Sequence, residues 1–344
     1  MRTRGKRRDQ RKLGLYCLVL AITIIVCGAF IYMLFSTMAT IISRPLEYRS
    51  QAENFVSSSN TQVQSITTNP SGENMIVAYS TRLDVSLNSS NVFLMDFDTR
   101  EVLMYQSGTA RIYPASLVKM MTALVAIENI SNLNEMVMLN EAIFQPIYDA
   151  NATTAGFLPG DSVRAIDLLF GLLLPSGAEC ATGLAKHVAG TEYAFVVMMN
   201  ERAKEIGMNN THFTNTTGLH NENQYSTVVD MAILLRYALE NEIFYQIITS
   251  SRHSTAGTSL RPGGITFHST LFSRMYNQEF YGGVILGGRT GFINQSGQNL
   301  ASFALVDGTK YILVTSGARN NGNHLTQALH IEDAFTVYGA INNR

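Results

Sequence analysis

The stretch from Tyr113 to Glu128 reads YPASLVKMMTALVAIE and predicts a buried helix around which the fold is built. Pro114 suits the first turn of a helix, where a missing backbone N–H breaks no hydrogen bond. Nearly every later position is apolar, so the helix has no solvent-facing side. Ser116 and Lys119 are three residues apart and therefore lie on one face of the helix, within reach of each other.

This pair suggests chemistry because a buried helix should not carry a free lysine. An apolar site lowers the proton affinity of an amine, so Lys119 could act as a base. A hydroxyl beside such a base can act as a nucleophile. Ser116 would also lie near the helix N-terminus, where free N–H groups favour developing negative charge. Because S-x-x-K also occurs by chance at exposed helix starts, the rest of the chain must decide its meaning.

Length and composition limit the possible number of domains and the possible partners of the chain. The chain has 344 residues, 46% of them hydrophobic and 15% charged, which allows one or two domains with a sizeable core. The formal net charge of -1 argues against nucleic acid as the main partner. Cys17, Cys27 and Cys180 form no recognisable disulfide framework, and the histidines show no H-E-x-x-H pattern. We therefore expect no metal and no cofactor.

The N-terminus predicts attachment to the cell membrane. Residues 1–12 are densely basic, and residues 13–35 contain no charge. As a helix the uncharged run would be roughly 35 Å long, enough to cross a bilayer. The basic flank should remain in the cytoplasm as a short tail, which places the rest of the chain on the extracytoplasmic side of a single-pass anchor. A cleaved signal peptide is the alternative, but its apolar region would be shorter and Thr37-Met38-Ala39 is a poor cleavage site.

Residues 36–74 are rich in Ser, Thr, Asn and Gln, which predicts a flexible stalk. Folded structure is expected from about residue 75, so that 75–344 form one catalytic domain. The sequence predicts strands, then many helices, then strands and a last helix, which indicates an α/β fold of the α+β type with a sheet built from both ends. The expected strands span 91–97, 101–105, 283–286, 299–306 and 310–316; the expected helices after the first span 163–174, 178–189, 192–206, 228–241 and 326–338. The polar stretch 209–226 is too long for a simple connection.

Polar clusters interrupt the apolar stretches at three places. They are Ser116-x-x-Lys119, then Ser176-Gly177-Ala178, then Gly287-Gly288-Arg289-Thr290-Gly291. Their order follows the S-x-x-K, S-x-N and K-T-G signature of penicillin-binding proteins and class A β-lactamases. The flanking words LLLPSGAECATGLAKHVAG, MNNTHFTNTTGLH and GGRTGFINQSGQNLASFA, together with the first helix, closely resemble low-molecular-weight penicillin-binding proteins, the serine-type D-alanyl-D-alanine carboxypeptidases.

The resemblance, over about residues 85–340, implies the penicillin-binding-protein/β-lactamase-like transpeptidase fold: an antiparallel sheet, flanking helices and a helical lobe. It implies that Ser116 attacks the terminal D-Ala-D-Ala bond of a peptidoglycan stem peptide, with Lys119 as base and Ser176 as proton relay. Arg289 and Thr290, next to Gly291, would hold the substrate carboxylate. Backbone N–H groups of Ser116 and Phe292 would form the oxyanion hole. β-Lactams would acylate Ser116 and inhibit the enzyme.

Two departures from the signature leave alternatives open. Ala178 stands where the second motif usually has asparagine, and Arg289 stands where the third usually has lysine. Losing the asparagine contact could cost about 1–3 kcal/mol in a buried site, which favours a weakened or purely peptidoglycan-binding protein as one alternative. Arginine keeps the positive charge and can bind a carboxylate with two hydrogen bonds. A β-lactamase is the other alternative, but no Glu-x-x-x-Asn word follows Ser176. Glu179 should point elsewhere on its helix.

Overall fold

The computed structural model describes residues 63–68, 74–78, 83–319 and 327–341. The chain divides into two units, Met1–Thr61 and Gln62–Arg344, and every described residue belongs to the second unit. The predicted basic tail and membrane anchor lie outside the described residues. Among the helices of the described ranges, none has both the length and the hydrophobicity to cross a bilayer.

Regular structure begins before residue 75. The strands β1 (Val63–Thr68) and β2 (Asn74–Ala78) pair antiparallel with each other. They overlap the end of the segment expected to be a stalk, and the predicted domain boundary at residue 75 stays a prediction. The rest of that segment lies outside the described residues, and its flexibility stays a prediction.

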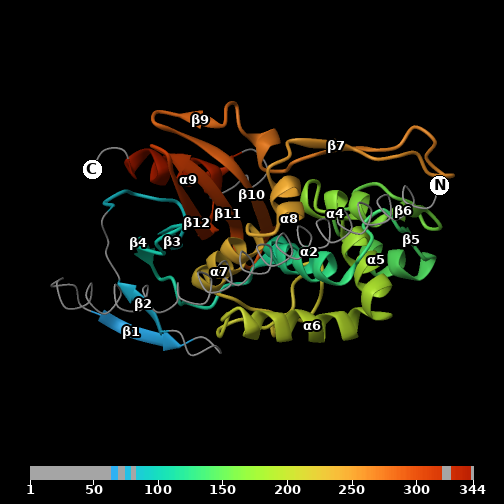
Figure 1. Ribbon diagram of the computed structural model, residues 1–344, viewed down its shortest axis with the longest axis horizontal. Coiled ribbons are helices and arrows are strands. Elements are labelled where there is room, and N and C mark those ends of the chain that lie inside the picture. Colours follow the sequence, from blue (N-terminus) through green and yellow to red (C-terminus); the bar gives the residue numbers. More distant parts are fainter. Residues whose placement is uncertain (1–62, 69–73, 79–82, 320–326, 342–344) are drawn as a thin grey trace, which may run out of the picture. The chain divides into compact units, whose positions relative to one another are not determined.

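A six-stranded antiparallel sheet, with strands from two separate parts of the sequence, forms the frame of the described unit (Figure 1). Its strand order is β4-β3-β12-β11-β10-β9, and each neighbouring pair is antiparallel. The strands are β3 (Asn91–Asp96), β4 (Val102–Gln106), β9 (Glu279–Phe280), β10 (Gly283–Ile293), β11 (Gly297–Val306) and β12 (Thr309–Ala318). Because β3 pairs with β12, the sheet is built from both ends of the catalytic part, as the sequence predicts.

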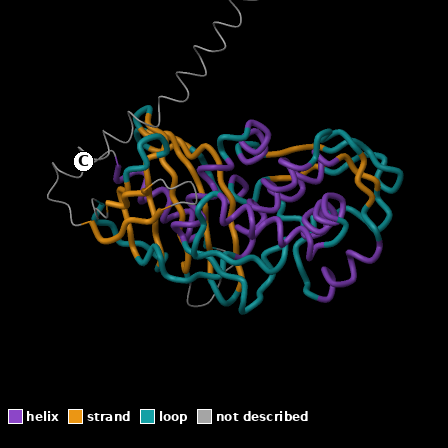
Figure 2. Tube along the Cα trace, turned by 60° about the horizontal axis from the view of Figure 1, so that its bottom comes forward, coloured by secondary structure: helices purple, strands orange, loops and turns teal. Residues whose placement is uncertain are grey.

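Both faces of this sheet are buried, each against its own hydrophobic core. Leu313 of β12 packs in a core with α9 (Leu329–Ile341), whereas its neighbours Ile312 and Val314 belong to the core on the other face. Successive strand residues point to opposite faces, so a continuous apolar run is what a sheet covered on both sides requires. Figure 2 shows the strands gathered in one part of the unit and most helices in the other.

The helical lobe lies between the two parts of the sheet in sequence. It contains η1 (Ala115–Leu117), α2 (Val118–Asn129), η2 (Glu141–Ile143), α3 (Phe144–Asp149), α4 (Ala165–Leu173), α5 (Ala178–Ala189), α6 (Glu192–Glu205), α7 (Val228–Ala238) and α8 (Glu242–Ile248). Two small two-stranded sheets and the turn η3 (Phe272–Arg274) complete the lobe and its return to the main sheet. In the first of these sheets β5 (Met136–Met138) pairs with β6 (Ser162–Arg164), and in the second β7 (Arg252–Ser254) pairs with β8 (Thr266–His268).

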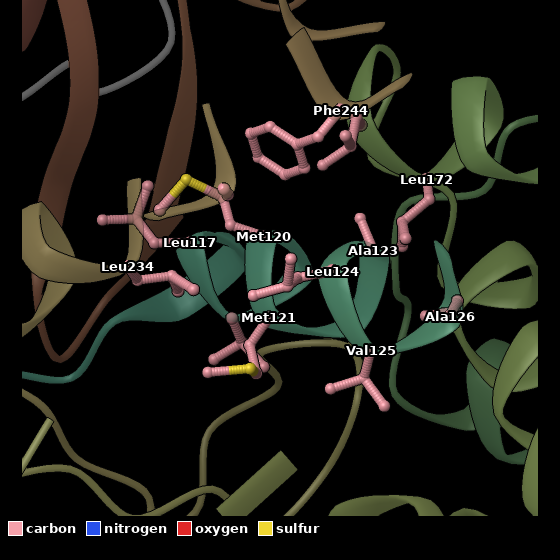
Figure 3. Close-up of a cluster of buried hydrophobic side chains, with 14 of the residues drawn as sticks. Leu117, Met120, Met121, Ala123, Leu124, Val125, Ala126, Leu172, Leu234 and Phe244 are labelled. Atoms are coloured by element: carbon pink, nitrogen blue, oxygen red, sulfur yellow. The ribbon is translucent and has the colours of Figure 1, made fainter. Parts of the chain in front are cut away.

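Helix α2 lies at the centre of the lobe, as its composition predicts. Ten of its residues, Val118 through Ile127, are buried, and Figure 3 shows Leu172 of α4, Leu234 of α7 and Phe244 of α8 around it. Fully burying an apolar side chain of this size contributes about 1.5–3 kcal/mol. The helix that carries Lys119 is therefore held rigidly by its surroundings.

Several predicted boundaries differ from the structure. The first helix opens with the 3₁₀ turn η1, and Pro114 precedes it rather than lying within it. Strand β10 continues to Ile293 instead of ending at residue 286, so the third motif lies on the strand. A register shift between Ile285 and Gly287 lets the strand bend without ending.

Candidate active site

The turn η1 places Ser116 at a strained point of the backbone. Ala115, just before it, has a φ of 49°, which is unfavourable for a residue with a side chain. The conformation is held from outside by Gly218, because a Cβ atom at Gly218 would lie 2.0 Å from the Ala115 carbonyl oxygen. Ser116 itself is only half-buried.

Lys119 is where the sequence predicts it, one turn along and almost fully enclosed. Its side chain is 3% exposed, and Nζ lies 3.4 Å from Ser116 Oγ. Burial, helped by the positive charge of Arg289, lowers the pKa of Lys119 from 10.5 to about 7, while Glu179 and Cys180 act in the opposite direction. Much of the amine is therefore neutral near pH 7, and its lone pair can accept the Ser116 proton.

The polar stretch 209–226 supplies a contact that the sequence did not reveal. The backbone carbonyl of Thr217 accepts a hydrogen bond of 2.5 Å from Lys119 Nζ. The side chain of Asn215 holds this turn by accepting from the N–H groups of Thr217 and Gly218. With one N–H of Lys119 fixed on Thr217, the amine is oriented toward Ser116.

Ser176 occupies the break between α4 and α5. Pro175 disfavours helix for the residue before it, which accounts for the end of α4 at Leu173. Ser176 then adopts a φ of 80°, and it is 7% exposed. Its hydroxyl donates a hydrogen bond of 3.1 Å to Ser116 Oγ. The first two motifs are thus brought together around one serine oxygen.

The second motif has no polar side chain at its third position. Ala178 is buried, and its N–H donates to the Thr153 carbonyl at 2.9 Å. The next residue, Glu179, points away from Ser116, and Oε1 accepts from the N–H groups of residues 155, 156 and 157 at 2.6, 2.9 and 3.3 Å. Burial raises the pKa of this carboxyl. Glu179 therefore fastens the Ser176 turn to a neighbouring loop, a role its helix position alone could not indicate.

Strand β10 brings the third motif to the same serine. A Cβ atom at Gly291 would lie 3.1 Å from the Ser116 backbone nitrogen, so the missing side chain keeps the space beside that N–H open. Thr290 is half-buried, and Phe292 is 41% exposed. The strand edge beside Ser116 is therefore accessible to an extended ligand.

Arg289 lies behind this edge rather than on it. It is 1% exposed, and Nε and Nη1 donate to the carbonyls of Ser116 and Leu173 at 3.4 and 3.2 Å. Burial lowers the pKa of Arg289 from 12.5 to about 9, which leaves it a cation at neutral pH. Its position beside the last carbonyls of α4 favours a positive charge. The direct two-bond contact with a carboxylate that the sequence suggested would need the guanidinium to become exposed.

Thr270 is a site residue that no sequence pattern singles out. It lies in the segment between β8 and η3, outside all three motifs. Its Oγ1 accepts from Arg289 Nη1 at 3.2 Å and lies 2.8 Å from Thr290 Oγ1. A single threonine in a segment without a pattern carries no signal that could have found it.

Together these groups provide what acyl transfer needs: a nucleophilic hydroxyl, a neutral amine as base, a second hydroxyl to move a proton, and a fixed positive charge. Within the described ranges, no three His, Cys, Asp or Glu side chains lie together in a way that could hold a metal ion. The arrangement defines the class of serine acyl-transfer enzymes that use lysine as the base.

A family model matches this chain, agrees with this class of enzyme and identifies the family within it. The model described as D-alanyl-D-alanine carboxypeptidase (peptidase S11) matches residues 77–320, and the chain belongs to this family. Among curated proteins, D-alanyl-D-alanine carboxypeptidase DacF of Bacillus subtilis is 28% identical over 265 residues, covering 74% of this chain. DacB2 of Mycobacterium tuberculosis is 31% identical over 220 residues, covering 63% of this chain and 71% of its own length. The matched region spans 64% of DacF and 58% of DacC of Escherichia coli.

Solved structures give the same fold. A D-alanyl-D-alanine carboxypeptidase from Mycobacterium tuberculosis aligns with a TM-score of 0.66 and 26% identity, covering 78% of this chain and 96% of that one. The DD-transpeptidase of Streptomyces K15 aligns with a TM-score of 0.66 and 24% identity, covering 74% and 98%. The predicted penicillin-binding-protein-like fold, an antiparallel sheet with flanking helices, is confirmed.

Proposed function

We propose that this chain hydrolyses the terminal D-Ala-D-Ala bond of peptidoglycan stem peptides through an acyl-enzyme on Ser116. The observation that carries the proposal is the meeting of Lys119 Nζ and Ser176 Oγ at Ser116 Oγ, at 3.4 and 3.1 Å. Membership of the D-alanyl-D-alanine carboxypeptidase family supports the choice of substrate. No cofactor enters the reaction.

In the first half-reaction, neutral Lys119 takes the proton of Ser116, and Oγ bonds to the carbonyl carbon of the penultimate D-alanine. The carbon–nitrogen bond breaks, and the proton passes through Ser176 to the nitrogen of the departing D-alanine. N–H groups of Ser116 and Phe292 stabilise the oxyanion. Water then attacks the ester and gives its proton to the same amine. The bond between Ser116 Oγ and the carbonyl carbon breaks, Oγ takes that proton back from Lys119, and the shortened peptide leaves. Arg289 supplies positive charge for the substrate carboxylate, which meets the strand at Thr290 and Gly291.

β-Lactams acylate Ser116 in the same way and remain attached longer than the peptide. The catalytic part works outside the cytoplasm, held at the cell membrane by the uncharged segment 13–35. This location is supported by that segment's sequence and by the peptidoglycan substrate.

A binding protein with little catalysis is the second candidate, and Ala178 favours it. An asparagine amide at this position could contact both the base and the substrate backbone, whereas alanine can do neither. The deletion of such a contact corresponds to about 1–3 kcal/mol, or roughly one to two decades in rate. The enzyme would then be slower rather than inactive.

The test uses the full chain in detergent with an acyl-D-Ala-D-Ala peptide. We expect D-alanine release and covalent labelling by a fluorescent penicillin, both abolished in Ser116→Ala. Labelling without D-alanine release would favour the binding protein, and rapid multiple turnover of the penicillin would favour a β-lactamase. Labelling that survives in Ser116→Ala would exclude Ser116 as the nucleophile.

A further inference from the structure

The positive charge of the third motif has no direct path to a ligand. Arg289 is 1% exposed, and its Nε and Nη1 donors are used by the carbonyls of Ser116 and Leu173 and by Thr270 Oγ1. The remaining nitrogen, Nη2, is buried and has no hydrogen-bond partner among the described residues. The residues of this cluster that reach the surface are Thr270 and Thr290, both half-buried.

The hydrogen-bond chemistry of these groups supports one continuous direction for their protons. A guanidinium can only donate, so the Thr270 oxygen accepts from Arg289 Nη1. Within the described part of the chain, Thr290 Oγ1 at 2.8 Å is the acceptor found for the single Thr270 proton. In this arrangement Thr290 accepts from Thr270, and the Thr290 proton points outward. The three groups form an ordered chain, Arg289 to Thr270 to Thr290, whose positive end faces the ligand.

We propose that Thr270 is a positioning residue that passes the charge of buried Arg289 to the substrate's terminal carboxylate by aligning the Thr290 hydroxyl. This inference rests on the proposed function and adds a residue outside the three motifs. The carboxylate meets a hydroxyl whose proton is already directed at it, and the guanidinium stays in place behind. The arrangement binds an anionic ligand end more strongly than a neutral one, because a hydrogen bond to a charged acceptor is the stronger.

The position of Thr270 does not depend on its hydroxyl. Its backbone N–H donates to the Leu174 carbonyl at 3.1 Å, and the following residue, Leu271, is fully buried. Thr270→Val keeps the shape of the side chain and removes only the hydroxyl, so the local backbone should be retained. Thr270→Ser keeps the hydroxyl and loses a methyl group. These two variants separate the hydrogen bond from the packing.

A matched control lies four residues earlier in the chain. Thr266 on β8 is exposed, and its hydroxyl pairs with Ser254 Oγ at 2.8 Å, away from the third motif. Thr266→Val is the same chemical change on the same segment. It should leave the reaction unaltered.

The experiment compares two substrates on the full chain in detergent: an acyl-D-Ala-D-Ala peptide and the same peptide ending in D-alaninamide. The ratio of their kcat/KM values measures recognition of the carboxylate. A hydrogen bond to a charged group contributes about 1.5–3 kcal/mol, so Thr270→Val should lower this ratio about tenfold or more. Most of the change should appear in KM for the acid. Thr270→Ser and Thr266→Val should retain the wild-type ratio.

An equal loss on both substrates in Thr270→Val would make Thr270 merely structural and overturn the inference. An unchanged ratio would overturn it as well. In both cases an active wild type leaves the proposed function standing. A wild type that releases neither D-alanine nor D-alaninamide and is not labelled by penicillin would refute the proposed function, and this inference with it.

Discussion

The pH dependence of acylation tests the central feature of the site, a lysine that is half neutral near pH 7. The pKa of Lys119 is lowered from 10.5 to about 7. The neutral fraction is therefore about 9% at pH 6, about 50% at pH 7 and about 91% at pH 8. The rate constant for acylation of Ser116 by a penicillin should rise about tenfold between pH 6 and pH 8 and then level off.

The assay is second-order labelling by a fluorescent penicillin, quenched at short times, across pH 5 to 9.5. The penicillin carboxylate stays ionised over this range, so the change in rate reports on the protein. A midpoint above about pH 9 would mean that the amine is well solvated, and the reasoning from burial would fail. Lys119→Arg provides the control, because its guanidinium remains protonated and cannot act as the base. It should lose the inflection together with nearly all of the rate.

The same pKa change predicts an effect on stability. The lowered pKa means that the unfolded chain binds more protons, so the burial of Lys119 costs about 5 kcal/mol below pH 7, and this cost falls as the pH rises from 7 toward 10.5. Lys119→Met removes the cost but leaves the buried Thr217 carbonyl without its donor, a loss of about 1–3 kcal/mol. At pH 6 the variant should be inactive yet roughly 2–4 kcal/mol more stable in urea denaturation. A stability difference that does not shrink between pH 7 and pH 9 would contradict the assignment.

Further predictions concern single contacts of the site. Ser176→Ala should lower kcat for D-alanine release by about 10²–10⁴, with KM and the thermal midpoint nearly unchanged. Glu179→Ala leaves three backbone N–H groups without their acceptor and should destabilise the fold by about 2–5 kcal/mol in urea denaturation, whereas Glu179→Gln keeps an acceptor and should lose less than half of that. Gly218→Ala places Cβ 2.0 Å from the Ala115 carbonyl and should reduce acylation by penicillin more than about tenfold. Gly190→Ala, also at positive φ but in open space, should lose only about 1 kcal/mol of stability and no activity.

The parts of the fold that the sequence predicts well are those with a strong local signal. The helix expected at residues 178–189 matches α5 residue for residue, because Gly177 and Gly190 mark its ends. The two-ended sheet follows from the order of strands and helices alone. The three motifs converge on Ser116 as predicted, since each combines polar residues with glycine or proline inside an apolar stretch.

Features that depend on long-range packing were missed or misplaced. Strand β10 runs through the glycines of the third motif because its neighbour β11 pairs with it along its full length, and no local propensity reveals that partner. The helix α8 and the hairpin of β7 with β8 have weak patterns of their own. Thr217 and Thr270 contribute to the site through contacts across 98 and 19 residues of chain, which a linear reading cannot assign.

Arg289 connects substrate binding to the strength of the base. Its charge is the second cause, after burial, of the low pKa of Lys119. A substrate carboxylate bound at Thr290 offsets part of this charge, so the pKa of Lys119 should rise when the substrate binds. The amine thereby becomes a stronger proton acceptor only when the bond to be cleaved is in place.

This coupling has a kinetic consequence with a definite sign. The acid limb of kcat/KM reports the free enzyme and should have its midpoint near pH 7, whereas the acid limb of kcat reports the complex and should lie at higher pH. The separation should vanish for the peptide ending in D-alaninamide, which brings no charge to Arg289. Coinciding limbs with the carboxylate substrate would show that Arg289 holds the ligand without acting on the base. In that case burial alone would account for the reactivity of Lys119.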